Sequence, residues 1–127
     1  STLIGTPYGN LDNFKKLAKN EGTVLYFENC ELSPCDVARR LWSINLAGWF
    51  EGINGVVLGR SAGKDTSNEN NLSYVEVVTD FFNELNLPLI YDVDIGHQQP
   101  NLTILNGSLV EFFVDEVGKG YLVSHLV

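Results

Sequence analysis

Residues 55–59 read GVVLG, an apolar run of mostly β-branched residues between two glycines. A short run of this kind is typical of a strand that is buried on both faces. Two further runs lie on either side of it in the chain, TVLYF at 23–27 and LPLIYDV at 87–93. The sequence therefore predicts three strands, and it predicts that TVLYF is buried in the same way as GVVLG.

Helix starts are predicted between these strands. Ser33 is followed by a proline and then by Asp36, and Ser73 is followed three positions later by Glu76. A serine at the N-cap accepts a backbone N–H, and an acidic residue three positions on completes the capping-box pattern. A further short helix is predicted over 10–20, and the second helix is predicted to end near Gly48. The side chains expected to face inward are Phe14, Leu17 and Ala18 on the first helix, Val37, Leu41 and Ile44 on the second, and Val75, Val78, Phe82 and Leu85 on the third.

The remaining segments predict an exposed loop and antiparallel strands. Residues 60–71 (RSAGKDTSNENN) are polar and read as a long exposed loop. Asn106-Gly107 is a favoured hairpin pair, because both residues tolerate positive φ. The expected antiparallel segments are LTIL (102–105), LVEFFV (109–114) and, after DEVGKG (115–120), YLVSHLV. The predicted fold is α/β, a mixed sheet with flanking helices and a C-terminal β-meander.

Length and charge exclude several classes of protein. The 127 residues suit one domain, and 44% of them are hydrophobic, but no run approaches the ~20 apolar residues of a membrane helix. The net charge is −8, and the eight basic residues are scattered, so neither a nucleic acid nor a membrane is expected as a partner. The chain has no initiator methionine and no signal-peptide pattern, and it is expected to be a piece of a longer protein.

The two cysteines do not predict a metal site. Cys30 and Cys35 lie five positions apart with no second pair of ligands nearby, so no structural zinc is expected. Two thiols in a chain without export features indicate a reducing compartment, and we expect a cytoplasmic protein. Both are expected to be small buried or half-buried residues.

Polar clusters follow two of the predicted strands. Glu28-Asn29-Cys30-Glu31 comes directly after TVLYF, and Gly96-His97-Gln98-Gln99 comes shortly after LIYDV. Functional groups of α/β sheets gather beyond the C-terminal ends of strands. If the two strands are neighbours, Glu28 and His97 meet, and a carboxylate beside a histidine orients it as a general base.

Other readings of these residues stay open. Glu28 could be an ordinary loop or capping residue. Asp92, Asp94 and His97 could form a carboxylate-rich metal site, although Asp94 more simply ends a strand and caps the loop. The chain also offers no serine in a sharp G-x-S-x-G turn, so a histidine–carboxylate pair would lack its nucleophile.

Three stretches together resemble a known family. YFENCELSP (26–34), LAGWFEGINGVVLGR (46–60) and DIGHQQPNLTILNG (94–107) are similar to the C-terminal domain of the LD-carboxypeptidase family of serine peptidases, which includes the microcin C self-immunity proteins. The most specific motif is a glycine–histidine pair followed by P-x-x-T and a glycine. The chain departs from many relatives at Asp94-Ile95, where they have Pro-Phe, and at Leu105, where they often have proline.

This resemblance implies a Ser-Glu-His triad, with Glu28 and His97 as its second and third members. It implies that residues 1–127 form the C-terminal domain, that residues 1–9 resemble the inter-domain linker, and that the serine belongs to a preceding N-terminal domain. The fragment alone would then be inactive. Asn29 and Gln98 would contact substrate.

The expected substrates are L,D-amides of murein peptides or the amide of a microcin C-type peptidyl- or aminoacyl-nucleotide. The expected partners are the protein's own N-terminal domain and a second copy in a homodimer, with no cofactor and no metal. The alternative is a non-catalytic binding or dimerisation domain, and one form of this alternative binds metal through Asp92, Asp94 and His97.

Overall fold

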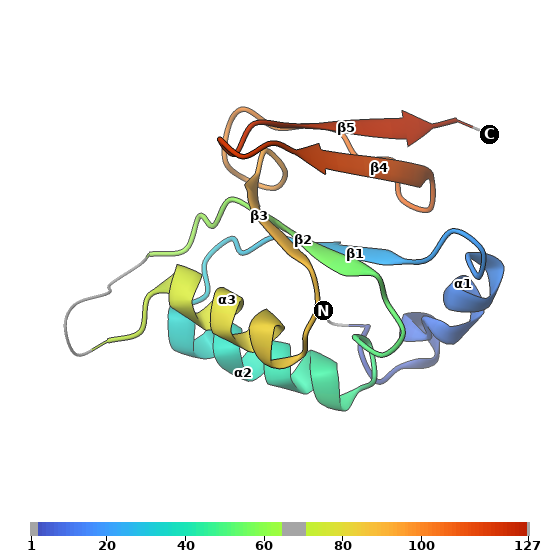
Figure 1. Cartoon of the computed structure of the whole chain (residues 1–127). Coiled ribbons are helices and arrows are strands. Elements are labelled where there is room, and N and C mark those ends of the chain that lie inside the picture. The colour runs from blue at the N-terminus through green and yellow to red at the C-terminus, as the bar shows by residue number, and fades with distance from the viewer. Residues whose placement is uncertain (1–2, 65–70, 127) are drawn as a thin grey trace.

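The computed structural model describes residues 3–64 and 71–126. Figure 1 shows a small sheet with two helices on one side and a separate β-hairpin on the other. The predicted α/β class is therefore confirmed. In chain order the elements are a 3₁₀ turn (Pro7–Gly9), α1 (Asp12–Leu17), β1 (Val24–Phe27), α2 (Pro34–Leu46), β2 (Gly55–Gly59), α3 (Tyr74–Glu84), β3 (Leu89–Val93), β4 (Leu109–Val114) and β5 (Gly120–His125).

The three predicted strands form one parallel sheet in the order β1-β2-β3. All five residues of the central strand β2 are buried, as its apolar run predicts. The first strand is not buried as predicted, since Val24 and Tyr26 are 37% and 42% exposed. The reason is its position, because an edge strand of this sheet has neighbours on one side only. Its other two residues, Leu25 and Phe27, are half-buried and pack against the core.

The core lies between β2 and the two long helices. On α2 the predicted inward residues are all buried, and the helix ends before Gly48, which has a φ of 75°. On α3 the buried stripe differs by one position from the prediction, because Val75 is 40% exposed. The buried side chains of α3 are Tyr74, Val77, Val78, Phe81 and Phe82. Burial of a large apolar side chain contributes about 1.5–3 kcal/mol, so this stripe is a main source of stability.

Caps begin both long helices at the predicted serines. Ser73 and Glu76 form a complete capping box, in which each side chain accepts the other residue's backbone N–H. At α2 the box is incomplete. Ser33 accepts the backbone N–H of Asp36, but the Asp36 carboxylate accepts from the Ser33 hydroxyl instead of the Ser33 backbone. This hydroxyl and Arg39 hold the pKa of Asp36 below its usual value.

The predicted inward face of α1 is wrong. The helix has six residues, none of them buried, and Leu17 is 88% exposed. The predicted hairpin at Asn106-Gly107 is also wrong, because Asn106 does not adopt the positive φ that the favoured two-residue turn requires. The hairpin instead joins β4 to β5, where the Asp115 carboxylate accepts the backbone N–H groups of Val117 and Lys119.

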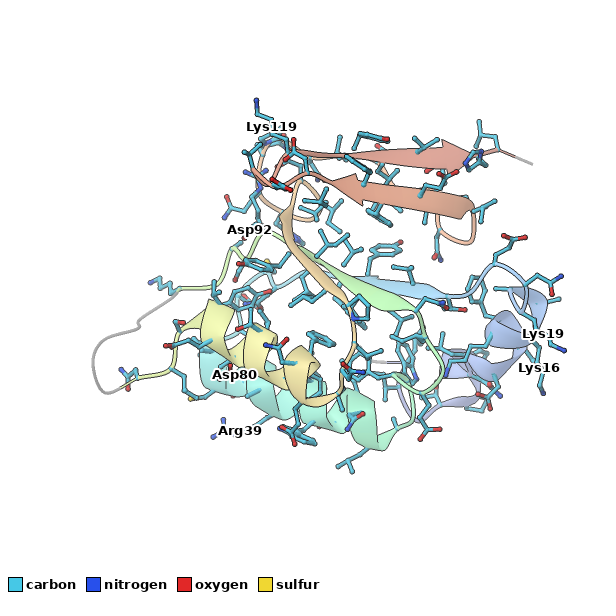
Figure 2. All side chains as sticks on the ribbon, in the orientation of Figure 1. Lys16, Lys19, Arg39, Asp80, Asp92 and Lys119 are labelled. Atoms are coloured by element: carbon cyan, nitrogen blue, oxygen red, sulfur yellow. The ribbon has the colours of Figure 1, made fainter. Side chains whose placement is uncertain are left out.

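The antiparallel part thus forms its own two-stranded sheet instead of a three-stranded meander in the described residues. Of the predicted exposed loop, residues 65–70 lie outside the described residues, while Arg60 to Gly63 are half-buried. Both cysteines are exposed, contrary to expectation, and have free thiols. Lys16 lies on α1, Lys19 lies two residues after its end, and Lys119 lies on the hairpin, so Figure 2 shows Lys119 far from the other two labelled lysines. Over residues 3–64 and 71–126, no helix has the length and apolar character needed to cross a membrane.

Candidate active site

Glu28 and His97 meet, although 69 positions separate them in the chain. The Oε1 atom of Glu28 lies 2.8 Å from the Nδ1 atom of His97. The carboxylate side chain is 27% exposed, whereas the imidazole is 64% exposed. Because an ionised carboxylate only accepts hydrogen bonds, a neutral imidazole in this position donates from Nδ1 and keeps its lone pair at Nε2. A histidine held in this tautomer can accept a proton at Nε2.

The two residues meet without their strands being neighbours. Strand β2 lies between β1, which precedes Glu28, and β3, which precedes His97. The segment after β3 therefore crosses the C-terminal end of β2 to reach Glu28. Ile95 is the buried residue of this crossing segment, with 5% exposure.

Two glycines provide the space for the crossing. A Cβ atom on Gly59, the last residue of β2, would lie 2.3 Å from the carbonyl oxygen of Ile95. A Cβ atom on Gly96 would lie 2.7 Å from Oε2 of Glu28, and Gly96 has a φ of +105° that side-chain-bearing residues rarely adopt. The glycine before the histidine is thus required both by backbone conformation and by the close approach of Glu28.

The other two predicted site residues differ in exposure, since Asn29 is buried and Gln98 is exposed. Asn29 is 7% exposed, and both hydrogens of its Nδ2 are used, at 3.0 Å from the Leu32 carbonyl and 2.9 Å from the Ser61 hydroxyl. Its Oδ1 accepts the Leu32 backbone N–H at 2.9 Å, so the side chain shapes the loop after β1. Gln98 is exposed next to His97, and its backbone carbonyl lies 3.3 Å from Nη2 of Arg60.

The metal alternative is wrong. Asp94 pairs with Arg60 at 2.9 Å, and His97 pairs with Glu28, so these two side chains are directed to different partners. Asp92 has a φ of +59°, which breaks the strand alternation expected to place it on one face with Asp94. Among the residues that the structure describes, no three histidine, cysteine, aspartate or glutamate side chains could hold a metal ion together.

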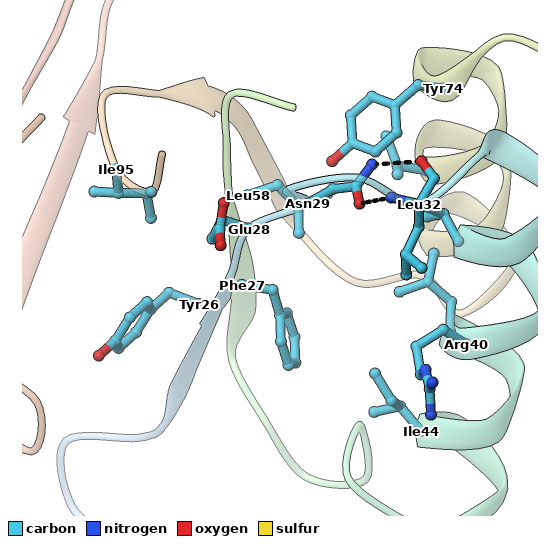
Figure 3. A pocket seen from close by; sticks show the side chains of 14 residues that line it. Tyr26, Phe27, Glu28, Asn29, Leu32, Arg40, Ile44, Leu58, Tyr74 and Ile95 are labelled. Carbon is cyan, nitrogen blue, oxygen red and sulfur yellow. Dashed lines mark hydrogen bonds between the residues drawn. The ribbon is translucent and has the colours of Figure 1, made fainter. Parts of the chain in front are cut away.

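A pocket of ≈ 370 Å³ lies against Glu28 and Gly96, between β1 and α2 (Figure 3). Most of its wall is apolar, and Arg40 supplies a positive charge. The lining residues are Tyr26, Phe27, Glu28, Asn29, Leu32, Val37, Arg40, Leu41, Ile44, Leu58, Tyr74, Val78, Ile95 and Gly96.

Tyr74 is the more buried of the two tyrosines that line this pocket, at 8% exposure against 42% for Tyr26. Burial, with smaller contributions from the negative charges of Asp92 and Glu28, raises the pKa of Tyr74 to about 12. The phenol therefore stays protonated at neutral pH, and it adds no charge beside Glu28.

Sequence reasoning missed Gly59, Tyr74 and Arg60 as parts of this region. Arg60 could have been noticed as a charged residue directly after an entirely apolar strand. The other two carry no such signal, because a strand-end glycine and a tyrosine in the first turn of a helix are common in unrelated contexts.

Comparison with known proteins identifies the family. Residues 1–112 match the sequence model of the LD-carboxypeptidase C-terminal domain. The fold is similar to that of the microcin C7 self-immunity protein MccF in an inactive mutant apo state, with a TM-score of 0.65 and 20% identity over 81% of this chain and 30% of that chain. It is also similar to muramoyltetrapeptide carboxypeptidase from Oxalobacter formigenes, with a TM-score of 0.69 and 22% identity over 90% of this chain and 42% of that chain.

The chain thus spans less than half the length of these two structures. The match covers most of the chain and includes both the Glu28 and the His97 segments. The resemblance read from the sequence is confirmed, and the chain belongs to the LD-carboxypeptidase family of peptidases, in which it corresponds to the C-terminal domain.

Proposed function

We propose that this chain is the C-terminal catalytic half of a serine carboxypeptidase and supplies Glu28 and His97 of a Ser-Glu-His triad. The observation that carries the proposal is the 2.8 Å contact between Glu28 Oε1 and His97 Nδ1. The contact leaves Nε2 free on an imidazole that is 64% exposed, where a serine from another domain can reach it. The serine would belong to an N-terminal domain, so the chain alone is expected to be inactive.

The reaction uses His97 twice. As the serine oxygen attacks the amide carbonyl, its proton moves to Nε2 of His97, and Glu28 stabilises the imidazolium that forms. When the C–N bond breaks, Nε2 returns this proton to the departing amine, and a water molecule then releases the acyl group by the same route.

The substrates that we propose are amides of two kinds. One is the L,D-amide of a murein peptide, and the other is the amide of a microcin C-type peptidyl- or aminoacyl-nucleotide. The names of the two similar structures support this pair of candidates. We propose a cytoplasmic homodimer in which this chain docks on its own N-terminal domain. Gln98, exposed beside His97, is the proposed substrate contact, and Asn29, whose amide is used by Leu32 and Ser61, is proposed to form part of the pocket wall.

The test is hydrolysis of a murein L,D-tetrapeptide and of an aminoacyl-sulfamoyl adenosine by the gene's full product and by this chain alone. Activity is expected only in the longer protein. Glu28→Gln should lower kcat by about 10⁴-fold, because an amide no longer fixes the tautomer, and His97→Ala should lower it at least as much.

A matched control is available in the second histidine–carboxylate pair. His125 Nε2 lies 2.7 Å from Glu111 Oε1 on the hairpin. Glu111→Gln removes the same kind of contact there, so it should leave kcat unchanged. Full activity of Glu28→Gln, or equal losses in both variants, would contradict the triad.

A non-catalytic dimerisation domain is the second candidate. One face of the hairpin carries Leu109, Phe113, Tyr121 and Val123, each at least 40% exposed, and the rings of Phe113 and Tyr121 stack 5.1 Å apart. The Glu111–His125 pair lies on the same face, and an exposed face that is otherwise apolar favours association with a second copy. An inactive full-length protein whose dimer dissociates on Phe113→Ser would support this candidate.

A further inference from the structure

Arg60 connects the end of β2 to the segment that carries His97. Its Nη2 atom lies 2.9 Å from Asp94 Oδ1, 2.6 Å from the Pro100 carbonyl oxygen and 3.3 Å from the Gln98 carbonyl oxygen. Its backbone N–H also donates to the Val93 carbonyl oxygen at 3.1 Å. One side chain therefore contacts the segment on both sides of His97.

The donor count identifies the principal contacts. Nη2 carries two hydrogens, so the two short contacts, to Asp94 and Pro100, use them, and the longer contact to Gln98 is shared. A charge-assisted hydrogen bond is about twice as strong as a neutral one. The guanidinium of Arg60 can therefore hold the loop at both Asp94 and Pro100. The loop adds bonds of its own, from Asn101 Nδ2 to the Gly96 carbonyl and from the Leu102 backbone N–H to the Asp94 carbonyl.

Arg60 is also more enclosed than a surface arginine. Its side chain is 29% exposed, and its Nε is buried without a hydrogen-bond partner in the described part of the chain. By contrast, the side chain of Arg39 on α2 is 77% exposed beside Asp36. Leaving the Nε donor of Arg60 buried and unsatisfied costs free energy. The contacts that Nη2 makes with the loop offset this cost and therefore determine the position of the side chain.

We propose that Arg60 is a positioning residue, which fixes the segment from Asp94 to Pro100 so that Nδ1 of His97 meets Glu28. The inference rests on the proposed function for its catalytic consequence, but its structural content is independent of activity. A substitution of Arg60 leaves the side chains of Glu28 and His97 unaltered. It removes the bonds to Asp94 and Pro100 that hold the loop, and with them the fixed orientation of the imidazole. Misplacement by about 1 Å is enough to lower a rate by about 10²-fold.

The first test is the tautomer of His97, read from the imidazole ¹⁵N shifts of the full 127-residue chain. In the unmodified chain His97 should be in the Nδ1–H form. His125 provides an internal reference, because its carboxylate partner contacts Nε2 and should select the opposite tautomer. Arg60→Met should convert His97 to a mixture of tautomers, Arg60→Lys should have an intermediate effect, and Arg39→Met should change neither histidine.

The second test is kinetic and uses the gene's full product. Arg60→Met should lower kcat by about 10²-fold with little change in KM. An unchanged His97 tautomer in Arg60→Met would overturn the inference. So would an Arg60→Met chain that does not fold, because that residue would then support the core instead of the loop. The unmodified full product could hydrolyse neither substrate while Arg60→Met still converts His97 to a mixture of tautomers. In that case the proposed function fails and the positioning role stands.

Discussion

The backbone of Ile95 passes over Gly59 so closely that a Cβ atom on Gly59 would lie 2.3 Å from the Ile95 carbonyl oxygen. This contact joins the end of the central strand to the segment that leads into Gly96 and His97. Because β1 and β3 are separated by β2, the Glu28–His97 pair depends on this crossing. The crossing and the pair are therefore one structural feature.

Gly59→Ala should push the Ile95 segment away from the end of β2 and so weaken the Glu28–His97 contact. We expect a loss of about 1–3 kcal/mol in the free energy of unfolding, the usual cost of overpacking a core site, measured by urea denaturation. The ¹⁵N shifts of His97 should show the lost tautomer preference. Ile95→Ala should not rescue the variant, because the nearest atom is a backbone oxygen; rescue would show that the side chain alone made the contact.

Gly96→Ala should disrupt the site more than an equivalent change elsewhere. It combines a positive φ with a Cβ position 2.7 Å from Glu28 Oε2. Gly118→Ala is the matched control, since Gly118 has a φ of +79° and open space around it. Each should cost about 1–3 kcal/mol for backbone strain, but only Gly96→Ala should alter the His97 tautomer. An altered tautomer in both variants would assign the effect to general destabilisation.

Tyr74 should make stability depend on pH in the alkaline range. Its pKa rises in the folded chain from the ordinary value of 10.0 to about 12. The stabilising contribution is complete below pH 10 and is lost as pH rises from 10 to 12, because the unfolded chain loses its phenolic proton first. Between pH 9 and pH 11.5 the unmodified chain should lose about 2 kcal/mol more than Tyr74→Phe in urea unfolding.

The control for this measurement is Tyr8→Phe, at a ring that is 86% exposed. This variant should follow the pH dependence of the unmodified chain. A Tyr74→Phe chain that does the same would show that the buried phenol titrates normally.

Ser73→Ala should destabilise α3 by about 1 kcal/mol, because it removes the acceptor for the Glu76 backbone N–H. Ser33→Ala is the natural comparison, since its hydroxyl is 3.3 Å from the Asp36 backbone nitrogen against 3.1 Å at Ser73. We expect the larger fall in the urea midpoint at Ser73, where the capping box is complete. The reverse order would mean that the reciprocal Glu76 bond contributes little.

Local patterns predicted much of the fold correctly. Apolar runs located β2 and β3, and serine caps located both long helices, because these signals depend on neighbouring residues alone. The α3 stripe was one position out at Val75, and the burial of β1 was overestimated, because each depends on which surface lies opposite. Asn106-Gly107 satisfied the local rule for a hairpin, but the chain makes its hairpin at Asp115, where β4 and β5 pair along their whole length.

The sequence by itself determined the element types, the family and the identity of Glu28 and His97 as the candidate pair, since strand-end position and motif are both local. Only the tertiary structure decided that Asp94 faces Arg60 instead of a metal, that the Asn29 amide donates to Ser61 in the loop after β2, and that a crossing segment joins Glu28 to His97. The physical reason is that these relationships depend on contacts between segments 30 to 70 positions apart. Such contacts are selected by the packing of the whole core and leave no periodic signal in the chain.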